Sequence, residues 1–119
     1  MSIEAFNPVE ASIEETLQAL ADGRVTSVEL MQWCLDRAAR IDTAGLNLHA
    51  IPVLNPHALE EARASDERRA AGTIGALEGV PFTVKDSYMV KGLTVASGSP
   101  AFANLVAQWD AFSVEKLRE

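Results

Sequence analysis

The chain has 119 residues, of which 48% are hydrophobic and 23% are charged, and its formal net charge at pH 7 is −7. This is the composition of a globular protein, and its excess of acidic residues argues against non-specific nucleic-acid binding, which needs lysine and arginine to displace phosphate counterions. Cys34 is the single cysteine, so no internal disulfide can form and a reducing compartment is expected. No signal peptide or apolar run of membrane-spanning length is recognisable, so we expect a cytoplasmic protein with no membrane partner.

Two capping boxes predict a helical lead-in over about residues 12–42. Ser12 with Glu15 opens the first helix and Thr26 with Glu29 opens a longer one, because each pair can satisfy backbone N–H groups of the first turn. Apolar residues at helical spacing give each helix one hydrophobic face: Ile13, Leu17 and Leu20 in the first, and Leu30, Met31, Cys34, Leu35, Ala38 and Ile41 in the second. We therefore expect a helical hairpin of two antiparallel helices, with Cys34 as a small buried hydrophobe.

The α/β core is expected to begin at about residue 46. His49–Leu54 is a strand candidate, and Pro52 within it favours a place at the edge of a sheet. His49 and His57 have no second histidine, cysteine or carboxylate nearby at ligand spacing. A metal site is therefore not expected.

A third helix is predicted after this strand candidate. Asn55 should act as its cap and Pro56 should occupy the first helical position, with the helix running from His57 to about Ala71. Its charged residues are expected to form an ordinary solvated surface: Glu60, Glu61, Arg63, Asp66, Glu67, Arg68 and Arg69.

Val80–Val84 is the most strand-like stretch of the chain, being rich in β-branched and aromatic residues. Gly75 and Gly79 permit tight turns on the approach to it, and Lys85 comes directly after it. A lysine held away from water loses its proton more easily and can act as a base. Alternatively, Lys85 and Asp86 form a solvated pair where a buried strand reaches the surface. From these residues alone the solvated pair is favoured, because lysines are overwhelmingly exposed.

The order of the motifs around Lys85 changes that balance. Leu77-Glu78-Gly79-Val80-Pro81 leads to Val84-Lys85-Asp86, and Gly92-Leu93, Ser97-Gly98-Ser99-Pro100-Ala101 and Asp110-Ala111 follow in turn. In this order the motifs resemble the N-terminal part of the amidase-signature enzymes. The resemblance implies hydrolysis of amide C–N bonds by a Ser–cisSer–Lys triad in which Lys85 is the lysine, a small-molecule amide as substrate, and no cofactor. The two serines of that triad belong to a Gly/Ser-rich motif that these 119 residues do not contain.

Three other polar residues near the lysine receive no catalytic role. Lys91 does not match the family motif. Ser97 and Ser99 lie in no Gly-x-Ser-x-Gly elbow, and no histidine follows them in the chain, so they are interpreted as loop-shaping residues.

The fold class that follows is α/β: an N-terminal helical hairpin, then the first strands and helices of a mixed sheet covered by helices. Asp110 is expected to cap a last helix that turns Phe112, Val114 and Leu117 inward. Val80–Val84 is apolar on both faces and needs neighbouring strands that the sequence does not provide. We expect residues 1–119 to be the N-terminal part of a single amidase domain, either within a larger protein or as a truncated product.

Two alternative functions stay open at this point. As the A-type component of an amidotransferase, the protein would pass ammonia from glutamine to a carrier-bound acid, and it would need a partner subunit for this. Alternatively, a non-enzymatic helical interaction module would fold alone and keep an apolar docking surface. The 119-residue chain by itself is expected to be inactive and to be loosely packed, self-associated as a homo-oligomer or dependent on a partner.

Overall fold

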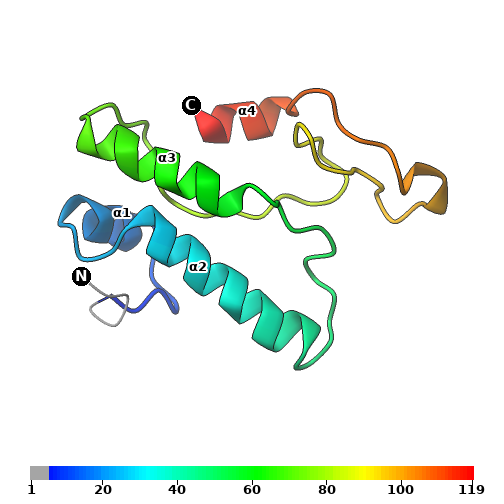
Figure 1. The fold of residues 1–119 in the computed structure, drawn as a ribbon, viewed down its shortest axis with the longest axis horizontal. Coiled ribbons are helices and arrows are strands. Elements are labelled where there is room, and N and C mark those ends of the chain that lie inside the picture. The colour runs from blue at the N-terminus through cyan, green and yellow to red at the C-terminus, as the bar shows by residue number, and fades with distance from the viewer. Residues whose placement is uncertain (1–5) are drawn as a thin grey trace. The chain divides into compact units, whose positions relative to one another are not determined.

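The computed structural model describes residues 6–119 and divides into two compact units, Met1–Pro81 and Phe82–Glu119. The first unit holds helices α1 (Ile13–Ala21), α2 (Ser27–Arg37) and α3 (Ala58–Ala70), with a π-helical segment at Ala38–Thr43 that continues α2 (Figure 1). The second unit holds a 3₁₀ turn at Pro100–Phe102 and helix α4 (Phe112–Arg118). No helix within residues 6–119 is long and apolar enough to cross a membrane.

Both predicted capping boxes are present, so the starts of α1 and α2 are confirmed. The Ser12 hydroxyl accepts from the backbone N–H of Glu15 at 3.1 Å, and the Glu15 carboxylate accepts from the backbone N–H of Ser12 at 2.7 Å. Thr26 and Glu29 repeat this exchange at 3.1 and 2.8 Å. Each box satisfies N–H groups that a helix start otherwise leaves without a partner.

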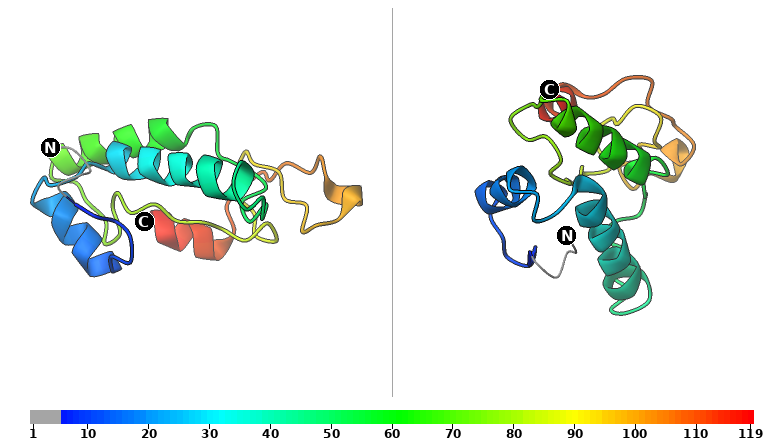
Figure 2. Two further views of the ribbon diagram at one scale, coloured as in Figure 1. Left: turned by 90° about the horizontal axis from the view of Figure 1, so that it is seen from below. Right: turned by 60° about the vertical axis from the view of Figure 1, so that its left-hand side comes forward.

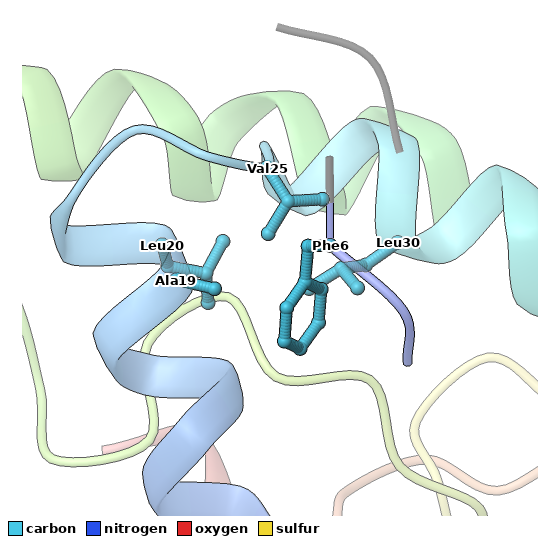
Figure 3. Packing of buried hydrophobic residues seen from close by; sticks show 5 residues of the cluster. All are labelled: Phe6, Ala19, Leu20, Val25 and Leu30. Carbon is cyan, nitrogen blue, oxygen red and sulfur yellow. The ribbon is translucent and has the colours of Figure 1, made fainter. Parts of the chain in front are cut away.

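A small apolar cluster forms the core of the first unit. Its buried members are Phe6, Ala19, Leu20, Val25 and Leu30, and the partly buried Ala11 and Val80 pack against it (Figure 3). The cluster joins the end of α1, the turn after it and the first turns of α2. Full burial of one leucine-sized side chain stabilises a fold by about 1.5–3 kcal/mol.

The predicted antiparallel hairpin of α1 and α2 is only partly right. The two helices share the apolar cluster, but Figure 1 looks almost along α1 while α2 lies across the page, so they cross. It is α3 that runs antiparallel to α2 and beside it (Figures 1 and 2). The buried face of α3 consists of Ala58, Ala62 and Ser65, small residues at helical spacing that allow a close approach.

The charged surface of α3 is not the uniformly solvated face that the sequence suggested. The carboxylate of Asp66 accepts from the backbone N–H of Ser27 at 2.8 Å and from that of Val28 at 3.1 Å. These are the first two residues of α2, so Asp66 caps α2 from a neighbouring helix. A carboxylate is well suited to this place, because the unsatisfied N–H groups give a helix start partial positive charge.

The segment Gly75–Pro81 is held against these helices by polar contacts to its backbone and to Glu78. The Ser27 hydroxyl donates to the carbonyl of Gly79 at 3.1 Å. Arg68 donates to both carboxylate oxygens of Glu78, at 3.0 and 2.8 Å, and Arg69 donates to the Glu78 carbonyl at 2.6 Å. Gly79 has φ +88°, a conformation that favours glycine, and a Cβ there would lie 3.2 Å from the Leu20 side chain, which would have to shift slightly.

Neither predicted strand forms within residues 6–119, so the mixed sheet of the expected α/β fold is not observed in this part of the chain. Val80–Val84 and the region of His49–Leu54 are non-helical but have no hydrogen-bonded neighbouring strand. Strands are defined by pairing, and an apolar run without a partner remains extended coil. The buried carboxylate of Asp42 instead accepts from the backbone N–H groups of Ala50 and Ile51, at 2.8 and 3.1 Å.

Two predicted helix starts differ from those observed. Helix α3 begins at Ala58, with Asn55 accepting from the backbone N–H of His57 at 2.9 Å in a turn before the helix. Helix α4 has Ala111 at its cap position with no side-chain bond, so the predicted cap by Asp110 is wrong. Of the three side chains predicted to turn inward from α4, Val114 is buried, but Phe112 is 73% exposed and Leu117 is 42% exposed.

We predict that Asp66→Asn lowers the free energy of unfolding by about 1–2 kcal/mol, because the amide replaces a charged acceptor and can no longer serve both N–H groups of α2. Urea unfolding followed by far-UV circular dichroism measures this. The matched control is Glu67→Gln, an exposed carboxylate of the same helix, which should change stability by less than about 0.5 kcal/mol. Equal unfolding midpoints for the two variants would contradict the capping role.

The Arg68–Glu78 pair predicts a pH-dependent contribution to stability. The hydrogen bonds from Arg68 hold the pKa of Glu78 below its usual value of 4.5, although burial acts in the opposite direction. The unfolded chain therefore binds the proton more readily, so this contribution is complete above pH 4.5 and is lost as the pH falls below it. The difference in unfolding free energy between wild type and Glu78→Gln should thus shrink on acidification from about pH 6 to about pH 3. Arg68→Gln should remove the same pH-dependent part of the unfolding free energy. A difference from wild type that stays constant with pH for both variants would refute this prediction.

Candidate functional site

Lys85 lies near the start of the second unit, directly after the non-helical Val80–Val84 stretch. Its backbone carbonyl accepts from the N–H of Tyr88 at 2.9 Å, so the chain turns directly after the lysine. The Lys85 side chain is exposed in this structure, and the partial removal from water that the sequence suggested is not seen here. Its predicted role as a base therefore stays a prediction.

The residue after the lysine joins the two principal motifs of this unit. The backbone carbonyl of Asp86 accepts from the N–H of Ser97 at 3.0 Å, and its carboxylate accepts from the N–H of Ala96 at 3.3 Å. The Lys85-Asp86 motif and the Ala96–Ser99 turn, which are separate in the sequence, are thus in direct contact.

The two serines of this turn shape the loop, as the sequence suggested. The N–H of Ser99 donates to the carbonyl of Ala96 at 2.8 Å, which closes a tight turn. Ser97 has φ +49° and Gly98 has φ +74°, both in the left-handed region. A turn with two central residues of positive φ is type I′, and a serine in that conformation is uncommon.

A short antiparallel contact flanks the Ala96–Ser99 turn. Thr94 and Val106 form an isolated β-bridge. On either side of it, the N–H of Val95 donates to the Leu105 carbonyl and the N–H of Ala107 donates to the Leu93 carbonyl, both at 2.9 Å. The bridge therefore joins the chain before the Ala96–Ser99 turn to the chain after it.

Asp110 has a bracing role that the sequence did not reveal. Its carboxylate accepts from the backbone N–H of Lys91 at 2.7 Å and pairs with the Arg118 guanidinium at 3.2 Å. Lys91 therefore takes part through its backbone. Aspartates in loops often accept from nearby backbone N–H groups, and this preference was the signal available in the sequence. The sequence could not show which N–H group Asp110 binds.

The described residues bring together no three histidine, cysteine, aspartate or glutamate side chains that could hold a metal ion. His49 and His57 both lie exposed in the first unit, and His57 pairs with Glu60 at 3.1 Å.

The arrangement around Lys85 offers an amine on a loop held by the contacts of Asp86, and such an amine can exchange protons or bind an anion.

Comparison with known proteins identifies the class to which this fold and loop belong. The sequence pattern of the Amidase family matches residues 29–119, and the chain belongs to this family of amidase-signature proteins. The match includes Lys85 and the motifs on both sides of it.

Relatives and solved structures agree with the family. The A subunit of the glutamyl-tRNA(Gln) amidotransferase from Aromatoleum aromaticum is 42% identical over 110 residues, which cover 92% of this chain and 22% of that protein. The native peptide amidase of Stenotrophomonas maltophilia is similar with a TM-score of 0.87 and 33% identity, over 92% of this chain and 22% of that one. An amidase family protein from Bacillus anthracis gives a TM-score of 0.89 and 29% identity, over 98% and 23%. The chain thus spans about a fifth of the length of these proteins, and over that part it has the amidase fold.

Cys34 is the one thiol of the chain, and its surroundings do not favour a nucleophile. It is half-buried on α2, and this burial raises the pKa of the Cys34 thiol above its usual value of 9.0, with the charge of Arg37 acting in the opposite direction. The expected buried hydrophobe is therefore partly exposed but poorly ionised.

We predict that Cys34 reacts more slowly with iodoacetamide in the folded chain than in the chain unfolded in urea at the same pH, because less thiolate is present. Arg37→Gln should slow the folded reaction further, since it removes the opposing positive charge. Mass spectrometry of the alkylated fraction over time measures both rates. A folded rate equal to or above the unfolded rate would show that the thiol is activated.

Proposed function

We propose that this chain is the N-terminal part of an amidase that hydrolyses amide C–N bonds, with Lys85 as the base of a Ser–cisSer–Lys triad. The observation that carries this proposal is the position of Lys85 within the family match, on a loop that Asp86 ties to the Ala96–Ser99 turn. The two serines would come from a Gly/Ser-rich motif outside these 119 residues. The substrate class would be small-molecule amides.

In the proposed reaction, the neutral amine of Lys85 accepts a proton from the bridging serine, which in turn takes the proton of the nucleophilic serine. The serine oxygen bonds to the amide carbonyl carbon, and backbone N–H groups stabilise the oxyanion. The proton then passes back through the same groups to the leaving nitrogen as the C–N bond breaks. Water completes the cycle by hydrolysing the acyl-serine bond.

The decisive test replaces Lys85 in the full-length protein. Lys85→Ala removes the amine, and Lys85→Arg keeps the charge in a guanidinium that does not deprotonate in proteins. Both variants should lose kcat by about 10²–10⁴-fold, the usual contribution of a general base. Ammonia release from a peptide amide and from a simple primary amide measures the loss, with Lys91→Ala as the matched exposed-lysine control.

The pH profile separates a base from a structural cation. Wild-type kcat/KM should fall on the acid side, because protonation of the free enzyme's lysine removes the base. Circular dichroism first establishes that each variant folds. Substantial activity in Lys85→Arg with an unchanged acid limb would eliminate the assignment.

A second candidate function is favoured by the names of the relatives. Proteins that are 36–42% identical to this chain are named as the A subunits of glutamyl-tRNA(Gln) amidotransferases. A protein of this kind would release ammonia from glutamine and pass it to a carrier-bound acid, and it would copurify with a partner subunit. Glutamine turnover that depends on a copurifying partner would favour this function, and turnover of simple amides by the protein alone would favour the hydrolase.

We further predict that the 119-residue chain alone releases no ammonia from these amides above a heat-killed control, because it lacks both serines of the proposed triad. Activity that is abolished by Lys85→Ala would refute this prediction.

Several large apolar side chains of the chain are strongly exposed, among them Leu46 at 73% and Leu48 at 64%. A stable, inactive monomer that keeps this apolar surface would instead fit an interaction module.

A further inference from the structure

Asp86 offers two acceptors to two consecutive N–H groups of another loop. Its backbone carbonyl takes the N–H of Ser97 at 3.0 Å and its carboxylate takes that of Ala96 at 3.3 Å. A residue bound at both its main chain and its side chain cannot rotate about its backbone without breaking one of the two contacts. Because Lys85 is joined to Asp86 by a peptide bond, its backbone is restricted as well.

The loop on the other side of these contacts is itself constrained. Ser97 has φ +49°, a conformation that usually persists in residues other than glycine only where the surroundings impose it. The closing bond from Ser99 to Ala96 and the bridge between Thr94 and Val106 impose it here. Asp86 therefore binds to a turn that is itself closed by hydrogen bonds.

A second contact fixes the lysine from the C-terminal side. The Lys85 carbonyl accepts from the N–H of Tyr88 at 2.9 Å, which defines the direction in which the chain leaves. The contact from the Asp86 carboxylate to Ala96 is made by a side chain, whereas the bonds from Ser97 and Tyr88 join main-chain atoms. It can therefore be removed by substitution without altering the main chain.

We infer that Asp86 is a positioning residue: it holds the main chain of Lys85 against the Ala96–Ser99 turn and so fixes where the lysine amine is presented. This inference rests on the proposed function of Lys85 as the base. Its physical basis is the sensitivity of proton transfer to placement, since a displacement of about 1 Å at a catalytic group costs up to about 10²-fold in rate. Asp86 acts through its hydrogen-bond acceptor, and its charge is not required.

The chain offers a matched control in Asp110. Like Asp86, Asp110 accepts from a backbone N–H in the second unit, that of Lys91 at 2.7 Å, but it braces a different part of the loop. General loosening of the unit should follow from either substitution. A loss of activity specific to Asp86 would therefore report on the placement of Lys85.

The experiment compares Asp86→Ala, Asp86→Asn and Asp110→Ala in the full-length protein, with a peptide amide as the probe. We expect Asp86→Ala to lower kcat by about 10²-fold with little change in KM, and Asp86→Asn to restore most of kcat, because its amide oxygen can accept from Ala96. Asp110→Ala should keep kcat within about fivefold of wild type among variants that remain folded. Hydrogen exchange at the Ala96 amide should accelerate in Asp86→Ala and stay slow in Asp86→Asn and Asp110→Ala.

Three kinetic results would overturn the inference: unchanged kcat in Asp86→Ala, an equal loss in Asp86→Asn, or an equal loss in Asp110→Ala. Each can occur while Lys85→Ala is inactive, in which case the proposed function stands and the positioning role fails. Full activity in Lys85→Ala would remove the proposed function itself. Slow exchange at Ala96 in Asp86→Ala would also overturn the inference, because the contact would then not hold the loop.

Discussion

The bond between the Asp66 carboxylate and the start of α2 is the contact on which the first unit depends. Helix starts leave N–H groups without intrahelical partners, and here a neighbouring helix supplies the acceptor. One capped residue, Ser27, also donates its hydroxyl to Gly79. The connection therefore runs from α3 through α2 to the segment that leads toward the lysine, and three elements distant in sequence are joined at one residue.

Other aspartates likewise accept from backbone N–H groups, in a fold whose only β pairing within residues 6–119 is the isolated bridge between Thr94 and Val106. Asp42 holds the backbone of Ala50 and Ile51, Asp86 holds that of Ala96, and Asp110 holds that of Lys91. In a sheet, neighbouring strands would satisfy such N–H groups. In these connecting segments side-chain carboxylates do so, and each holds irregular backbone by hydrogen bonds.

The features that sequence analysis predicted correctly are those determined by residues close together in the chain. Both capping boxes span three positions, so Ser12 and Thr26 could be identified directly. The cap from Asp66 could not, because 39 residues separate it from Ser27 and nothing local distinguishes Asp66 from the exposed Glu67. The strand at Val80–Val84 was overestimated for a related reason, since composition indicates a preference for extended backbone but pairing depends on other segments. At the candidate site, Lys85 was singled out through its motif and its role stays a prediction, whereas the contacts of Asp86 and Asp110 depend on how the loops fold.

The long sequence separations in the first unit also determine the order in which it can fold as it is made. A chain emerges from its N-terminus, so α2 is complete well before Asp66 has been added. The Ser27–Gly79 bond spans 52 residues and must form later still. Until then α2 relies on its own capping box and on the apolar cluster around Leu20 and Leu30. The side-chain contacts of the second unit span fewer residues, 19 between Lys91 and Asp110 and 10 between Asp86 and Ala96, so they can form sooner. The contacts of the early helices are therefore complete only after the segment before Lys85 has been made and Gly79 has bonded to Ser27.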